Sequence, residues 1–245
     1  MKIISIINQK GGVGKTTTVI NLASALSQLG KKILVIDLDP QGNATTGLGL
    51  SNTDQSDQTI YGILNGTTSI SNVVKKTNFQ NLDLITSNVD LSGLEVETAG
   101  DSDRAFILKA KLTAYFNDSG ISYDYVLIDC PPSLSLLTVM ALVSSNSLLV
   151  PLQTEFFALE GLTQLMKTIE RIKSNLNPSL DIRGILLTMY DRRNKLSTQV
   201  ESEARKYFKE KVYGTVVPRN VRLSEAPSHG IPVLLYDKSC PGSKA

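Results

Sequence analysis

The segment Lys10-Gly11-Gly12-Val13-Gly14-Lys15-Thr16-Thr17 follows an apolar run at Ile3–Ile7 and opens directly into a helical pattern. Glycines let the backbone curl so that successive N–H groups point inward, toward an anion. The start of the following helix adds the positive end of its dipole. In a phosphate-binding loop of this kind, Lys15 contacts the β- and γ-phosphates and the Thr16 hydroxyl binds Mg²⁺. The segment therefore predicts a nucleotide site formed by residues 10–17.

One position of this loop departs from the usual pattern. A standard phosphate loop has glycine where this chain has Gln9, and Lys10 follows it. The alternative interpretation is a flexible glycine-rich turn with no ligand. With each fixed residue at about 5–7% usage, the six matching positions would arise by chance in roughly one of 10⁵ chains of this length. We therefore favour the phosphate loop.

Two carboxylates follow the second apolar run, Lys32–Ile36. Because side chains alternate along a strand, Asp37 and Asp39 are expected on one side of the chain at the carboxyl end of that strand. Ligands bind at this end of parallel α/β sheets. One carboxylate could orient a water for attack on the γ-phosphate, and the other could support the Mg²⁺ shell. The alternative is an ordinary acidic loop.

A third carboxylate ends the run Tyr125–Ile128. Four apolar residues followed by Asp129 fit the second magnesium element of phosphate-loop enzymes, in which the aspartate binds the ion through water. Alone this pattern is weak, because many buried strands end in aspartate, but it gains weight from the upstream loop. Pro131-Pro132 stiffens the following turn, which could respond to the γ-phosphate.

The rest of the chain alternates between apolar runs and helical patterns. The runs are rich in Ile, Val and Leu with little polar alternation, as in strands covered on both faces. We predict one α/β domain over residues 1–245, with a mostly parallel, doubly wound sheet and helices on both faces. Further strands are predicted at Leu82–Ile85, Ser147–Val150, Ile182–Leu187 and Val212–Val217, and helices at Thr16–Leu29, Arg104–Phe116, Leu134–Ser144, Leu159–Leu176 and Thr198–Phe208. The polar stretch Gly42–Gly66 is expected to be a loop with a short helix at Thr59–Leu64.

Bulk composition bounds the function. Hydrophobic residues make up 41% and charged residues 20% of the 245 residues, an ordinary globular mixture. No apolar run is long enough to span a membrane, and a strand pattern begins at once, so we expect a cytoplasmic protein. Cys130 and Cys240 lie far apart and form no metal-spaced cluster. The net charge of +2 does not by itself indicate nucleic acid, so any DNA site must gather basic residues locally or double them by dimerisation.

Several motifs together resemble the ParA/Soj chromosome-partitioning ATPases, a branch of the deviant-Walker group of phosphate-loop proteins. The resemblance runs from residue 2 to about residue 238. Besides the segment 10–17, it rests on residues 37–45, residues 128–133, Ala158-Leu159-Glu160-Gly161-Leu162, Leu187-Thr188-Met189-Tyr190-Asp191 and residues 217–230. The last of these motifs is specific to this branch.

The resemblance implies roles for individual residues. Lys10 is similar to the family's signature lysine, which reaches the partner's phosphates across an ATP-sandwich homodimer, and a side chain at Gly11 would obstruct that dimer. Asp39 matches the residue needed for hydrolysis, which leaves Asp37 for the second shell of Mg²⁺. The resemblance also places Pro218 and Asn220 near the adenine, and Arg193 and Arg222 on DNA phosphates. For the two arginines the alternative is a solvated face.

The family resemblance further implies a mechanism and partners. The ATP dimer binds double-stranded DNA without sequence preference, because dimerisation doubles a basic patch that is weak in one subunit. A ParB/Spo0J-type protein stimulates the slow hydrolysis, in analogy to an arginine finger. We expect nucleoid association and no membrane.

Two departures and three rival classes complete the prediction. The family usually ends in an amphipathic helix, where this chain has Pro241 and Gly242, and the chain lacks the N-terminal DNA-binding extension of large plasmid partition proteins.

A MinD-like membrane-associated ATPase would need a basic, apolar C-terminal helix. A nitrogenase-type electron-transfer ATPase would need two suitably placed cysteines. A small-molecule ligase or kinase would turn over without DNA or a protein activator.

Overall fold

The apolar runs of the sequence become the strands of a single sheet. In the computed structural model, which describes residues 1–51, 53 and 55–245, the sheet has eight strands. Positions 52 and 54, within the polar stretch Gly42–Gly66, lie outside the described residues. The strands are β1 (Lys2–Ile6), β2 (Ile33–Asp37), β3 (Lys75–Lys76), β4 (Leu82–Ile85), β5 (Tyr125–Asp129), β6 (Ser147–Gln153), β7 (Asp181–Tyr190) and β8 (Val212–Pro218).

The strand order places the ends of several strands beside one another. The order is β3-β4-β2-β5-β1-β6-β7-β8, and every pair is parallel except β3 with β4. Because the strands are parallel, their carboxyl ends share one edge of the sheet. The register pairs Asp129 with Ile6 on one side and with Asp37 on the other. The phosphate loop after β1 and the two carboxylates therefore meet at one place.

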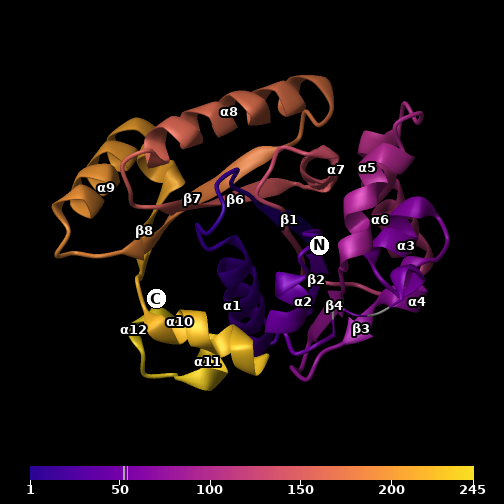
Figure 1. Cartoon of the computed structure of the whole chain (residues 1–245), viewed down its shortest axis with the longest axis horizontal. Coiled ribbons are helices and arrows are strands. Elements are labelled where there is room, and N and C mark those ends of the chain that lie inside the picture. The colour runs from indigo at the N-terminus through magenta and orange to yellow at the C-terminus, as the bar shows by residue number, and fades with distance from the viewer. Residues whose placement is uncertain (52, 54) are drawn as a thin grey trace.

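Helices cover both faces of this sheet (Figure 1). One face carries α1 (Lys15–Gln28), α2 (Asn43–Gly47) and the C-terminal helices α10 (Val221–Glu225), α11 (Val233–Tyr236) and α12 (Pro241–Lys244). The other face is covered by α3 (Ile60–Asn65), α4 (Ile70–Val73), α5 (Leu94–Glu97), α6 (Ile107–Asp118), α7 (Leu136–Ser144), α8 (Ala158–Asn175) and α9 (Lys195–Phe208). Short 3₁₀ segments connect them, of which η5 (Ala226–His229) matters below.

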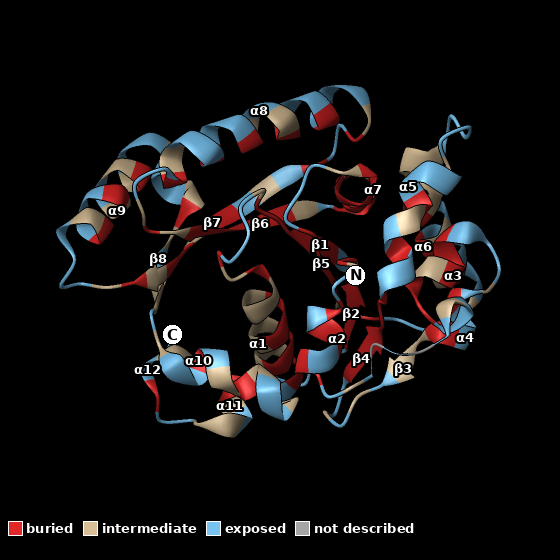
Figure 2. Ribbon diagram, in the orientation of Figure 1, coloured by how far each residue is buried: buried red, intermediate tan, exposed pale blue. Residues whose placement is uncertain are grey.

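Alternate residues of the strands feed separate apolar cores. Ile4, Ile6 and Val35 pack with α1, whereas Leu34 and Ile36 pack with α3, α6 and α7. A further core joins β6 and β7 to α8 and α9. The strands are consequently buried along most of their length, while the outer helices are exposed on one side (Figure 2). Burial on both faces accounts for the unbroken Ile/Val/Leu runs in the sequence.

The predicted α/β class and the mostly parallel sheet are confirmed. The sequence did not predict the two-residue strand β3 or the short C-terminal helices. Pro241 begins the four-residue helix α12, which is possible because proline lacks only an N–H that a first helical position does not use. No helix among the described residues combines the length and apolar character needed to cross a membrane.

Candidate nucleotide-binding site

The phosphate loop has the backbone that its glycines predict. Gly12 and Gly14 adopt left-handed φ values of 74° and 91°, which residues with a side chain rarely take. Gly14 immediately precedes α1, whose first-turn N–H groups have no partner within the helix. A side chain at Gly11 would meet only Pro132, at 3.9 Å between β-carbons, so nothing within the subunit demands glycine there.

Lys15 lies in the interior of this loop. Its side chain is buried, and its ammonium donates a hydrogen bond to the Lys10 carbonyl at 3.1 Å. Burial lowers the pKa of Lys15, while the carboxylates of Asp129 and Asp39 act in the opposite direction. A cation enclosed by loop backbone and close to carboxylates fits a role on phosphate oxygens, which the predicted site requires.

Asp129 provides the test of the predicted magnesium site. The residue is fully buried, and neither carboxylate oxygen has a hydrogen-bond partner among the described residues. Burial raises the pKa of Asp129 well above its usual range, and the Asp37 carboxylate adds to the shift, whereas Thr16 and Lys15 oppose it. An orphaned carboxylate next to a threonine hydroxyl fits a hydrated Mg²⁺, which binds through few protein ligands together with phosphates and water.

Asp37 and Asp39 are held differently. Asp37 is fully buried and accepts hydrogen bonds from the Thr45 amide and hydroxyl, both at 2.7 Å, so it fastens the start of α2 to the end of β2. Burial is the main cause that raises the pKa of Asp37 to about 6. Among the described residues, the Asp39 carboxylate accepts one hydrogen bond, from the Gln41 amide at 3.0 Å, and 7% of the residue is exposed. Asp39 is thus the carboxylate with capacity left for a water.

Lys10 forms an ion pair with Glu155, which follows β6. The Lys10 side chain is 50% exposed, and its backbone N–H donates to Asn8 at 3.0 Å. The pairing with Glu155 is a contact that the sequence did not predict. An exposed lysine at the rim of the loop is free to exchange this partner for another anion, such as a phosphate group from a second subunit.

Sequence reasoning also missed a contact that anchors the loop to β7. The buried Thr188 hydroxyl donates a hydrogen bond of 2.8 Å to the Val13 carbonyl. Thr188 stood within a recognised motif, but no local pattern predicts a contact between residues so far apart in sequence. It ties the phosphate loop to the strand that precedes Arg193.

The segment expected near the adenine lies beside the start of α1. Pro218 ends β8, and Asn220 precedes α10 with its side-chain oxygen buried and without a partner among the described residues. A hollow of about 340 Å³ separates α1 from this segment; its lining includes Thr17, Thr18, Val217 and Leu223. Pro218 follows the lining residue Val217, but neither Pro218 nor Asn220 lines this hollow, so their contact with adenine stays a prediction.

The two arginines expected on DNA follow β7 and β8, at the same edge of the sheet as the phosphate loop. Arg193 is bound bidentately by Asp191, with both N–O distances at 3.0 Å. Arg222 pairs with Glu225 at 2.8 Å and with Asp237 at 3.5 Å. Arg192 and Arg219, which the sequence did not single out, line a hollow of about 500 Å³ together with Arg193. The structure thus brings Arg192, Arg193 and Arg219 together but not Arg222, and contact of the two predicted arginines with DNA stays a prediction.

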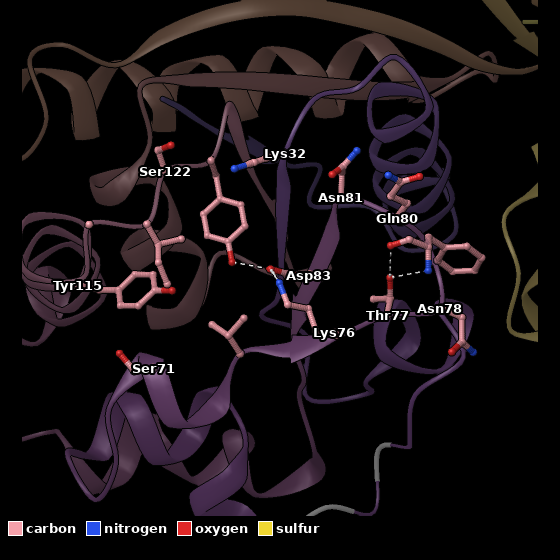
Figure 3. Close-up of a pocket in the computed structure, with 15 residues that line it drawn as sticks. Lys32, Ser71, Lys76, Thr77, Asn78, Gln80, Asn81, Asp83, Tyr115 and Ser122 are labelled. Atoms are coloured by element: carbon pink, nitrogen blue, oxygen red, sulfur yellow. Dashed lines mark hydrogen bonds and ion pairs between the residues drawn. The ribbon is translucent and has the colours of Figure 1, made fainter.

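Another hollow, of about 940 Å³, lies away from this chemistry (Figure 3). It is lined by Lys32 and Asn81, which precede β2 and β4, so it occupies the amino-terminal edge of the sheet. Its one carboxylate, Asp83, is held by Lys76 and by the Tyr123 hydroxyl, each at 2.7 Å. Because that carboxylate is already neutralised, the hollow has none of the features of the phosphate loop.

Comparison with known sequences identifies relatives over the whole chain. A family model described as an AAA domain matches residues 1–182. The chromosome partitioning protein ParA of Caulobacter vibrioides is 54% identical over 245 residues, covering all of this chain and 91% of that protein. The sporulation initiation inhibitor protein Soj of Bacillus subtilis is 50% identical over 243 residues, covering 99% of this chain and 94% of its own length.

Solved structures share the fold. Cobyrinic acid a,c-diamide synthase from Mycobacterium smegmatis, with a bound ATP analogue and magnesium, is 33% identical, covers 98% of this chain and 96% of its own, and has a TM-score of 0.82. The cell division ATPase MinD of Pyrococcus furiosus is 28% identical, with a TM-score of 0.80 and coverage of 100% and 94%. Both resemblances extend through the residues that build the site.

Proposed function

The chain belongs to the ParA/Soj family of chromosome-partitioning ATPases, and from that premise we propose that it is an ATP-operated DNA clamp. In this proposal an ATP-bound homodimer holds DNA without sequence preference and releases it on hydrolysis, which a ParB/Spo0J-type protein accelerates. The observation that carries it is a shared location. Lys15, Asp39, Asp129 and the loops with the two arginines all follow strands whose carboxyl ends lie at one edge of the sheet.

The chain's own residues divide the hydrolysis between them. Lys15 would hold the β- and γ-phosphates, while Thr16 and the water-linked Asp129 would hold Mg²⁺, which neutralises phosphate charge when bound. Asp39 orients a water and accepts its proton as the water oxygen bonds to the γ-phosphorus. The bond from the γ-phosphorus to the bridging oxygen breaks, and ADP and phosphate result. Lys10 would release Glu155 and contact the phosphates of the partner subunit.

The basic surface explains why assembly would control DNA affinity. Each phosphate contact contributes separately, and binding falls steeply with salt, so two copies of a weak patch bind far more tightly than one. In the single subunit, carboxylates occupy both Arg193 and Arg222. DNA phosphates would have to replace these carboxylates, so a single subunit would bind DNA weakly. The dimer, with two copies of the basic patch, would bind it more tightly.

The direct test is co-sedimentation of the purified protein with a long duplex in ADP or ATP over a salt series. We expect binding only with ATP, a steep loss with salt, and loss of binding in an Arg193→Ala/Arg222→Ala variant that still binds ATP. Binding that ignores the nucleotide would contradict the clamp. Absence of DNA binding together with ATP-dependent liposome binding would indicate a MinD-like function, and rapid turnover without DNA or partner would indicate a ligase or kinase.

A second prediction concerns the carboxylate that holds Arg193. Asp191→Asn should raise the DNA affinity of the ATP form about 3- to 10-fold, because one negative charge leaves the phosphate path and the guanidinium loses its competitor. The measurement is fluorescence anisotropy with a labelled duplex. Asp181→Asn is the matched control, since Asp181 also pairs with a cation, Lys211, but begins β7 rather than following its end. Equal effects in both variants, or weaker binding in Asp191→Asn, would contradict the prediction.

A further inference from the structure

Two glycines from distant parts of the chain meet backbone to backbone. A β-carbon on Gly49 would lie 3.0 Å from the Gly230 carbonyl oxygen, and one on Gly230 would lie 2.8 Å from the Gly49 α-carbon. Both residues have left-handed φ values, 80° and 65°. No side chain fits at either position without moving one backbone away from the other.

Each glycine belongs to a segment that carries part of the proposed function. Gly49 follows α2, which begins a few residues after Asp39. Asp37 holds this helix by accepting hydrogen bonds from Thr45. Gly230 ends η5, which continues from α10 and its Arg222. Figure 1 shows α2 and the C-terminal helices on the same face of the sheet, flanking α1, and α2 contacts η5 directly.

The packing around the glycine pair leaves little room for independent movement. Gly47, at the end of α2, is closed in by Ile20 of α1, whose terminal carbon would be 2.4 Å from an added β-carbon, and by Pro227 of η5 at 3.6 Å. Closely packed elements transmit displacement because they shift between discrete arrangements rather than deforming continuously. These contacts are the ones through which a movement of the Asp39 loop would reach η5.

We propose that Gly49 and Gly230 are positioning residues that couple the nucleotide state at Asp39 to the orientation of Arg222. The inference rests on the proposed function for the roles of Asp39 and Arg222. It adds a route within one subunit by which ATP hydrolysis changes the DNA-binding face. This effect is separate from the dissociation of the dimer. The close backbone approach is what makes the route stiff, and a methyl group at either glycine separates the two segments.

The chain offers matched controls for this test. Gly66 has a φ of 86° and Gly120 a φ of 64°, and an added β-carbon at either would meet nothing within 4 Å. Gly49→Ala is compared with Gly66→Ala, and Gly230→Ala with Gly120→Ala. Within each pair the alanine suffers the same unfavourable backbone conformation, and only one member disturbs the contact.

The readout is the ratio of DNA affinity in ATP to that in ADP, measured beside ATP affinity and melting temperature. We expect Gly49→Ala and Gly230→Ala to lower this ratio about tenfold, within the usual range of coupling between sites, while the controls keep the wild-type ratio. A merely structural contact would lower the melting temperature of Gly49→Ala and Gly230→Ala below that of their controls and leave the ratio unchanged. Equal ratios within each pair would overturn the proposal.

Hydrogen exchange on the wild-type protein decides the matter if the variants do not fold. Amides of residues 43–50 and 220–231 should change protection together between ADP and a non-hydrolysed ATP analogue. A change in residues 43–50 with none in residues 220–231 would overturn the coupling. Absence of ATP-dependent DNA binding in the wild type would instead overturn the proposed function, and the exchange comparison would still test the contact itself.

Discussion

Asp39→Ala should bind ATP about as tightly as the wild type and hydrolyse it 10²- to 10⁴-fold more slowly, the usual contribution of a positioned general base. The residue is nearly buried, and its single hydrogen bond, from the Gln41 amide, leaves one carboxylate oxygen available for a water. Phosphate release in a single turnover measures the loss. In gel filtration with ATP, the variant should accumulate as a dimer that retains DNA, because the step that dissolves it is blocked.

Asp39→Asn separates chemistry from structure in this experiment. Asparagine keeps an oxygen for the Gln41 amide, so the loop conformation is preserved while the basic carboxylate is lost. We expect Asp39→Asn to be as inactive as Asp39→Ala. Near-normal hydrolysis in the asparagine variant would show that Asp39 does not accept the proton. Weak ATP binding in both variants would show that Asp39 contributes to binding ATP rather than to the hydrolysis step.

Lys15→Ala should lower ATP affinity at least 100-fold, equivalent to about 3 kcal/mol or more at 1.4 kcal/mol per tenfold change. Lys15 is the buried cation within the loop, and its removal leaves the charges of Asp129 and Asp39 facing the phosphates without compensation. Loss of a buried charge-assisted contact has effects of this size. Equilibrium binding of a fluorescent ATP analogue provides the measurement.

Lys10→Ala is the matched control, because it removes a lysine from the same loop that points out of the subunit. Its side chain is half exposed and pairs with Glu155 rather than with the interior of the loop. We expect ATP affinity within a few-fold of the wild type, together with loss of the ATP-induced dimer and of DNA binding. Equal losses of ATP affinity in both variants would contradict the division between a lysine that binds ATP and one that joins subunits.

Most of the fold could be predicted because burial on both faces leaves a strong sequence signal. The runs at Leu82–Ile85 and Tyr125–Ile128, and the helix expected at Leu159–Leu176, differ from the observed elements by at most a residue at either end. Strand β3 escaped prediction because two lysines at a sheet edge carry no apolar pattern. Helices α10 to α12 escaped it because each is too short to show a helical period.

The site divides in the same way. Glycine spacing predicted the loop, since its left-handed positions need that residue type. The aspartates could be predicted as strand-terminal carboxylates, but not that Thr45 would occupy Asp37 while Asp39 kept a free oxygen. Contacts such as Thr188 with Val13 and Gly49 with Gly230 depend on tertiary packing between distant segments. Patterns in a single sequence describe residues that are neighbours along the chain, so they do not predict contacts between distant segments.

The position of β1 also has a consequence for biosynthesis. Strand β1 precedes the other seven strands along this chain and lies at the centre of the sheet, whereas its neighbours, β5 and β6, end only at Asp129 and Gln153. At about 5–20 residues per second, several seconds or more pass before both have been translated. Until Asp129 has been translated β1 lacks both of its partner strands, and until Gln153 it lacks one of them. The nucleotide pocket is therefore assembled only after both neighbouring strands have been made, although its phosphate loop precedes them in the chain.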